Sequence, residues 1–238
     1  MKWRGRIRNR SGAPAKDAVD HTARKIGYAS LLISALAVLV PFAQQEFFRR
    51  EGNAERVVIA AARSLDLPLV DSGSNFARSG RLINEPWRIT LSNNGSRTIS
   101  VVDLQIEKHE GNSQVFYTGL NAGLFNRDGS ALHMPVQLQA GESQIIIAHV
   151  GIVAPFNAYA ALKDQFDQNS GKVNNLAAIQ SLARSHTDLY GNPVEYQEFK
   201  SGGFLIERTS NPKLPVFAVR LKTGGGSEFL QSMSSDHP

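Results

Sequence analysis

The chain has 238 residues, a formal net charge of +5 and no cysteine. Without cysteine it can form no disulfide framework, no Cys-ligated metal site and no lipid-modified N-terminal cysteine, so its stability must come from buried apolar side chains. The charge is uneven: residues 1–25 carry eight Lys or Arg and two Asp, whereas residues 26–238 carry 18 basic and 19 acidic residues. The basic balance thus belongs to the N-terminal tail, and we predict no nucleic-acid partner.

The first predicted element is residues 26–45, which contain no charged side chain. A helix of about 20 residues, rising about 1.5 Å per residue, crosses the ~30 Å hydrocarbon core of a bilayer. Lys and Arg near such a span are retained on the cytoplasmic side, and the excess of basic residues lies before it. We therefore predict a cytoplasmic tail at 1–25 that also attracts anionic lipid, a transmembrane helix at 26–45, and an extracytoplasmic remainder.

A cleaved signal peptide is the main alternative, because Ala35-Leu36-Ala37 offers small residues at a cleavage spacing. Two features favour an anchor instead. The basic region before the apolar run is 25 residues long, and cleavage after Ala37 would leave the apolar residues 38–40 at the new N-terminus. A buried core helix is the third interpretation, which the uncharged length of the segment disfavours.

The exterior region is long enough for one domain with its own core. Residues 46–80 are predicted to form either a stalk or a first strand followed by a loop. Ala residues within Val57–Ala62 favour helix while Val57, Val58 and Ile59 favour strand, so the sequence leaves both open. The Gly- and Ser-rich stretch Asp71–Gly80 predicts a loop.

The clearest strand signal is the alternation of Trp87, Ile89 and Leu91 with polar residues. The following Asn93–Ser96 predicts a tight hairpin into a second strand at 98–106. In that second run the apolar side switches at Val101, which predicts a bulge there or a strand covered on both faces.

More apolar runs follow at short intervals, with a turn predicted at 140–143, and they indicate an antiparallel sandwich or barrel. The runs are Val115–Tyr117, Val136 with Leu138, Ile145–Val150, Phe204–Ile206 and Val216–Leu221. Residues 152–186 break this pattern and predict two short helices separated near 168–171. Their apolar positions are Phe156, Tyr159, Leu162 and Phe166 in the first helix, and Leu176, Ile179 and Leu182 in the second.

The stretches PWRITLSNNGSRTISVVDLQI and PVQLQAGESQIIIAHV resemble bacterial immunoglobulin-like sandwich domains, in which an N-x-G turn joins two strands and an L-x-x-G-E turn precedes another. The resemblance covers Pro86–Val150 and implies an adhesive, scaffolding or binding role. The predicted fold is therefore mainly β: a transmembrane helix followed by an antiparallel immunoglobulin-like β-sandwich at 81–223. A two-helix insertion at about 152–186 interrupts the sandwich, and a flexible C-terminal tail at 224–238 follows it.

Glu107 and His109 are candidate metal ligands, because they are two residues apart on a predicted strand and so share a face, and Glu110 is adjacent. The possible third ligands, His133 and His149, are distant in sequence. The sequence has no G-x-S-x-G elbow and no phosphate-binding glycine loop.

A calcium loop starting at Asp167 fails, because Gly171 stands at the fifth position rather than the sixth and Ala178 occupies the twelfth. We predict no catalytic residue, no metal ligand and no cofactor.

The predicted function is a membrane-anchored, extracytoplasmic binding or scaffold module of the cell envelope without catalysis. Its partners would be the lipid bilayer and other envelope proteins. The alternatives are a membrane-tethered, hydrolase-like enzyme whose residues converge only in space, and a secreted protein released by signal-peptide cleavage.

Overall fold

The computed structural model describes residues 55–76, 78–111, 113–200, 203–208, 212 and 214–233. These lie within the second of two units, Asn53–Pro238. The predicted cytoplasmic tail at 1–25 and transmembrane helix at 26–45 fall outside the described residues. Within the described residues, no helix has the length and apolar character needed to cross a membrane.

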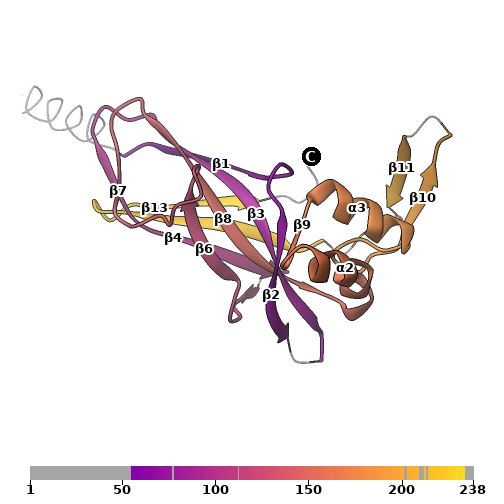
Figure 1. Cartoon of the computed structure of the whole chain (residues 1–238). Coiled ribbons are helices and arrows are strands. Elements are labelled where there is room, and N and C mark those ends of the chain that lie inside the picture. Colours follow the sequence, from indigo (N-terminus) through magenta and orange to yellow (C-terminus); the bar gives the residue numbers. More distant parts are fainter. Residues whose placement is uncertain are drawn as a thin grey trace, which may run out of the picture. The chain divides into compact units, whose positions relative to one another are not determined.

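The described chain is mainly β, with antiparallel sheets and two helices (Figure 1). The first sheet is built around the long strand β3, which pairs with β8 on one side and with β2 and β1 on the other. The strand order is β6-β8-β3-β2-β9, with β1 beside the later part of β3. Its strands are β1 (Val57–Arg63), β2 (Leu69–Phe76), β3 (Gly80–Asn93), β6 (Asn121–Asn126), β8 (Ser143–Ala154) and β9 (Lys172–Val173).

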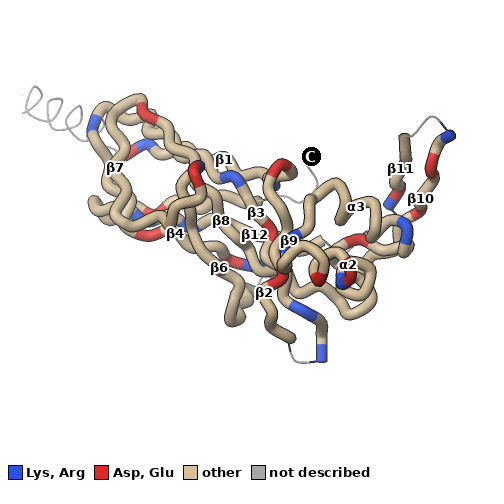
Figure 2. The backbone as a smooth tube through the Cα atoms, in the orientation of Figure 1, with Lys and Arg blue, Asp and Glu red and all other residues tan. Residues whose placement is uncertain are grey.

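The second sheet has the order β13-β12-β4-β5, and β7 pairs with the start of β4. Its strands are β4 (Ile99–Glu110), β5 (Ser113–Val115), β7 (Val136–Leu138), β12 (Val216–Thr223) and β13 (Glu228–Met233). A separate two-stranded sheet joins β10 (Val194–Glu198) to β11 (Phe204–Arg208). Acidic and basic residues are interspersed along the described strands and helices (Figure 2).

The two large sheets share one apolar core. Trp87 of β3 meets Phe217 of β12 edge to face, with the ring centroids 6.4 Å apart. Trp87, Ile89 and Leu91 are all fully buried while Arg88 is exposed, which confirms the strand predicted from their alternation. Each such side chain contributes about 1.5–3 kcal/mol by its removal from water, and burial alone builds this core because the chain has no cysteine.

The predicted two-helix insertion is confirmed as α2 (Phe156–Gln168) and α3 (Asn175–Arg184), which lie at one end of the strands (Figure 1). Leu162, Phe166 and Leu182 pack into the core. The first apolar residue of each helix stays exposed, since Phe156 and Leu176 are 50% and 56% exposed. Each helix therefore buries only the part of its face that meets the sheets or the other helix.

The predicted Asn93–Ser96 hairpin is wrong, because β3 and β4 belong to different sheets. The Asn93 side chain is buried in the connection between them. It donates to the carbonyl oxygens of Arg97 (2.6 Å) and Leu138 (3.0 Å) and accepts the N–H of Gly95 (2.9 Å). An Asn that bonds nearby backbone groups suits a turn of either kind, so the residue types did not distinguish a hairpin from a crossing between sheets.

Three other local expectations have clear outcomes. Residues 57–63 are strand β1, which settles the choice between helix and strand left open at Val57–Ala62. The loop predicted at Asp71–Gly80 is wrong: β2 continues to Phe76 and returns into β3 at Gly80, with an irregular register between Asp71 and Asn75. The bulge predicted near Val101 is confirmed, because Thr223 pairs with Val101 while Lys222 pairs with Asp103, leaving Val102 unpaired and 41% exposed.

The tail predicted at 224–238 is also wrong over residues 228–233, which form β13 and pair with β12. The glycines before it, Gly224–Gly226, form the turn of this hairpin, and Gly226 adopts a φ of +88°. Thr223 closes the turn by donating its N–H to the Ser227 carbonyl (3.0 Å). Met233 is fully buried, so burial at the strand's end holds it against the core. Residues 234–238 lie outside the described part of the chain.

Candidate functional site

A cavity of about 370 Å³ lies between α3, the segment that follows it, and the β10–β11 hairpin. This volume falls in the range of about 300–1,000 Å³ that is usual for small-ligand sites. Its walls are mainly aliphatic, with a small set of polar side chains among them. The aliphatic residues are Leu69, Ala178, Ile179, Leu182, Ala183, Leu189, Val194 and Ile206, and the polar ones are Arg63, Asn175, Thr187, Asp188, Tyr190 and Arg208.

One wall is a face of α3. Its lining residues Ala178, Ile179, Leu182 and Ala183 recur at helical spacing and so project from one side of the helix. Asn174 starts this helix, because its side-chain oxygen accepts the N–H of Leu176 at 2.9 Å.

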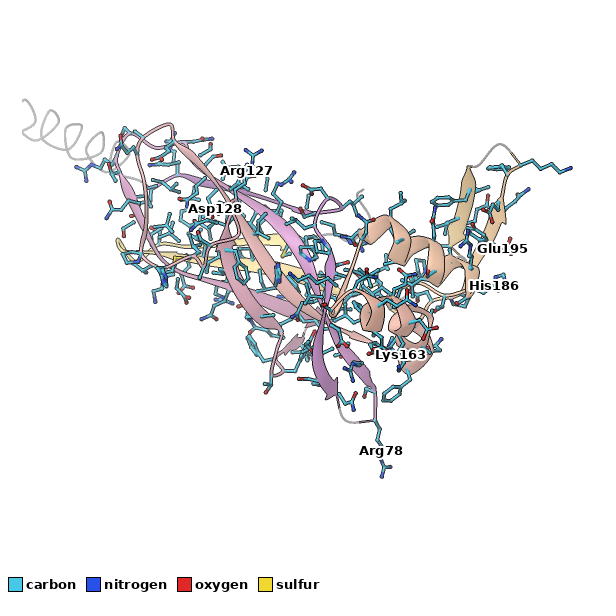
Figure 3. The ribbon with its side chains drawn as sticks, in the orientation of Figure 1. Arg78, Arg127, Asp128, Lys163, His186 and Glu195 are labelled. Atoms are coloured by element: carbon cyan, nitrogen blue, oxygen red, sulfur yellow. The ribbon has the colours of Figure 1, made fainter. Side chains whose placement is uncertain are left out.

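The opposite wall is one face of the β10–β11 hairpin, which contributes Val194 and Ile206. Successive strand residues point to opposite faces, so Glu195 and Glu207, paired with each other across the hairpin, face away from the cavity. His186 and Glu195 lie beside each other where the chain passes from α3 into β10 (Figure 3), and Val194 donates its N–H to the His186 carbonyl (3.3 Å).

The segment between α3 and β10 is shaped by Asp188. Its carboxylate accepts the N–H groups of Tyr190 (2.9 Å) and Asn192 (2.8 Å) and the side-chain amide of Asn192 (2.9 Å). It also lies 3.9 Å from the guanidinium of Arg208 on β11. Asp188 therefore fixes the turn that places Tyr190 in the cavity wall and ties that turn to the hairpin.

A buried ion pair forms the base of the site. Glu85 of β3 is only 1% exposed, and Arg63 at the end of β1 is 14% exposed and binds Oε1 of the Glu85 carboxylate. The other carboxylate oxygen, Oε2, accepts the indole N–H of Trp87 (2.9 Å) and lies 3.4 Å from the Tyr190 hydroxyl. Among the described residues, the Nε–H of Arg63 is buried without an acceptor.

The electrostatics keep these groups in one protonation state. Burial raises the pKa of Tyr190, and the nearby Glu85 carboxylate raises it further. Burial works against the charge of Arg63, but the Glu85 carboxylate outweighs it and the pKa of Arg63 is raised. At neutral pH Tyr190 is therefore a neutral phenol and Arg63 a cation, so both can position a ligand but neither exchanges protons readily.

A second cavity, of about 590 Å³, lies beside the end of β4, and Tyr190 lines it as well. Pro212, Leu214 and Pro215 form part of its wall. Residues 209–211 and 213 of the same segment lie outside the described residues.

The candidate metal ligands Glu107, His109 and His149 make other contacts. Glu107 is buried and bound by Arg220, and although burial raises the pKa of Glu107, the Arg220 guanidinium lowers it more. His109 lies 3.4 Å from Glu107, whereas the ring of His149 packs on Phe125 with centroids 4.8 Å apart. Over the part of the chain that the structure describes, no group of three or more His, Asp or Glu side chains is placed to hold a metal ion.

Neither a protein-family model nor a curated protein matches this chain.

The residues of this site were not predicted from the sequence, although one signal was present. Alternate residues of β3 share its buried face, and Glu85 is one of them, together with Ile83, Trp87, Ile89 and Leu91. Buried carboxylates are rare unless they are paired, which predicts a cationic partner without naming it.

Proposed function

We propose that this chain is a non-catalytic, membrane-anchored binding or scaffold module of the cell envelope. Residues 26–45 hold it in the bilayer with residues 1–25 in the cytoplasm, and the folded domain binds its partner outside through the cavity beside α3. The observation that carries the proposal is the cavity itself, whose aliphatic walls surround a few polar groups fixed by neighbouring residues.

The charges of the site support recognition. Arg63 is paired with Glu85, and Arg208 lies 3.9 Å from Asp188, so the formal charges in and beneath the cavity sum to zero. Fixed polar groups among apolar walls orient a ligand and provide specificity, while the apolar walls supply affinity.

The domain is in this proposal an immunoglobulin-like sandwich. The strand order β1-β3-β8-β6 in one sheet and β13-β12-β4 in the other supports it, because constant-type immunoglobulin domains arrange their first, second, fifth and fourth strands opposite their third, sixth and seventh. On this assignment, β2, β9, the two helices and the β10–β11 hairpin are additions at one end of the sandwich. These additions build most of the cavity walls.

Anchoring is tested on the full-length chain expressed in bacterial membranes. We expect alkaline carbonate to leave the chain in the membrane fraction and inside-out vesicles to protect residues 46–238 from added protease. Release of the intact chain by carbonate would refute the anchor. A mature chain shorter by 37 residues would instead support the secreted alternative.

Binding is tested by a photo-crosslinking side chain placed at Ile179, inside the cavity, in the same membranes. The matched control is Leu176, on the same helix but 56% exposed and outside the cavity lining. We expect a discrete adduct from Ile179 that the control position does not give. Equal cross-linking from the two positions would count against a binding role for the cavity.

A membrane-tethered, hydrolase-like enzyme is the second candidate, favoured by a concave site that collects a buried carboxylate and groups with shifted pKa values. The directions of the shifts argue against it, because they hold Tyr190 and Arg63 protonated. Saturable hydrolysis of a p-nitrophenyl ester by the full chain, abolished by Ile179→Trp, would establish the enzyme; we expect no such turnover.

A further inference from the structure

We propose that the cavity beside α3 receives aliphatic side chains of an uncharged, extended peptide segment, whose backbone pairs with the edge of β11 that faces away from β10. This inference rests on the proposed binding function and names the class of its partner.

The charge balance of the site selects a neutral ligand. Glu85 already neutralises Arg63, and Asp188 lies near Arg208, so an added carboxylate or ammonium group would lose its hydration without meeting an unpaired opposite charge. A peptide segment without charged side chains does not incur this desolvation cost.

The hairpin selects an extended backbone. β10 and β11 form a sheet of only two strands, and no other described strand lies beside β11. An edge strand presents unpaired N–H and C=O groups that an added strand satisfies. Because Ile206 of β11 lines the cavity, a peptide added beside this strand runs along the cavity mouth.

The size of the cavity suits two side chains of such a peptide. In an extended chain, residues two apart project to the same face at about 6.5–7 Å spacing. A cavity of about 150 Å³ holds one benzene-sized group. The 370 Å³ beside α3 therefore has room for two aliphatic side chains at alternate positions.

The test uses the full chain in lipid nanodiscs and a fluorescent, N-acetylated, C-amidated hexapeptide that alternates leucine and threonine, followed by fluorescence anisotropy. We expect saturable binding that Ile179→Trp weakens at least tenfold by filling the cavity. Leu176→Trp adds the same bulk to the exposed side of the same helix and should stay within twofold of wild type.

A further comparison addresses the backbone of the peptide. Methylating alternate backbone nitrogens of the peptide removes strand pairing but keeps its side chains, and should weaken binding at least tenfold. Circular dichroism confirms that each variant is folded. Unchanged affinity with the methylated peptide would overturn strand pairing.

Octanol and octanoate serve as competing probes that separate the two proposals. If either binds in a manner sensitive to Ile179→Trp while the peptide does not bind at millimolar concentration, the peptide assignment is overturned and the binding function stands. If no probe binds and Ile179 gives no specific cross-link in membranes, the binding function itself fails.

Discussion

We predict that the ion pair between Arg63 and Glu85 contributes strongly to the free energy of unfolding. Three variants test this: Arg63→Met, Glu85→Leu, and the double variant that combines them. Arg63→Met leaves a carboxylate that is 1% exposed with only the Trp87 indole N–H and the more distant Tyr190 hydroxyl as partners. Glu85→Leu leaves a guanidinium that is 14% exposed, and it removes the acceptor of the Trp87 indole N–H.

Removing one partner of a buried ion pair costs about 3–5 kcal/mol, because the other charge stays buried without compensation. We expect Arg63→Met to lie near the upper end of that range, since the Glu85 carboxylate is almost fully enclosed, and Glu85→Leu near the lower end, since Arg63 reaches solvent more easily. The double variant buries no charge and should lie within about 2 kcal/mol of wild type. The losses of the single variants then sum to about 8 kcal/mol, so the coupling free energy should be about 6 kcal/mol and at least about 4 kcal/mol.

The assay is urea unfolding of the full chain in detergent micelles, followed by circular dichroism in the β-sheet region. The control is Arg88→Met, which breaks the exposed pair with Asp66 (side chains 45% and 65% exposed) and should change the free energy of unfolding by less than about 1 kcal/mol. If the free-energy losses of the single variants simply add in the double variant, the two side chains are not energetically coupled and the account of the site's base is refuted.

Three other predictions use the same unfolding assay. Gly151→Ala should lower the free energy of unfolding by about 2–3 kcal/mol, because the new Cβ would lie 2.0 Å from the Gly119 carbonyl oxygen. The control is Gly224→Ala, whose Cβ would make only an ordinary contact with Ser100 (3.5 Å) and should leave the free energy of unfolding nearly unchanged. Asn121→Ala should lower the free energy of unfolding by about 1–3 kcal/mol. The Asn121 side-chain oxygen accepts the Ile106 N–H (2.7 Å) and its NH₂ group donates to the Ile106 carbonyl (3.0 Å) at the open edge of β4. A loss no larger than that of Gly224→Ala would contradict this bridging role. Burial lowers the pKa of His149 below its usual 6.5, so the unfolded chain binds more protons at this residue than the folded chain does. The free energy of unfolding should therefore keep its full value above about pH 6.5 and fall as the pH drops below it. His149→Phe should remove this part of the loss in acid, and an unchanged pH profile would contradict the prediction.

Much of the fold could be predicted because its strands carry their own pattern. The alternation of Trp87, Ile89 and Leu91 reflects a strand with one buried face, and the switch of apolar side at Val101 marked a real bulge in β4. In both cases the signal is local, since the pleat itself sets the period of two.

The errors arose where distant partners decide the structure. β2 is rich in Gly and Ser, yet pairing with β3 makes it a strand, helped by Arg81, whose guanidinium binds Asp71 at 2.9 Å. The Tyr159 hydroxyl of α2 donates to the same Asp71 carboxylate at 3.0 Å. β13 likewise has a composition typical of a tail, and its burial comes from β12 and the core. The residues at Asn93 correctly predicted a turn, but they did not indicate that the chain passes there from one sheet into the other.

The candidate site was beyond sequence reasoning for the same reason. The site combines the end of one strand (Arg63), the middle of another (Glu85) and an irregular segment (Tyr190). More than a hundred residues separate Glu85 from Tyr190 in the sequence. Only the position of Glu85 on the buried face of β3 could be predicted from the sequence. The cavity wall itself depends on how α3 and the β10–β11 hairpin lie against each other, and no periodicity encodes that arrangement.

The same ion pair connects the stability of the domain to the geometry of the cavity. Glu85 binds Arg63 and lies 3.4 Å from the Tyr190 hydroxyl, and both of these side chains line the cavity, whereas Glu85 itself lies beneath them. Holding ligand-contacting groups in place before binding reduces the entropy lost on association. Glu85→Leu should therefore weaken both folding and ligand binding, while Ile179→Trp should weaken binding alone, because Ile179 is only half-buried and adds no charge to the interior. If Glu85→Leu lowers the free energy of unfolding yet leaves peptide affinity unchanged, the pair supports the fold without organising the site.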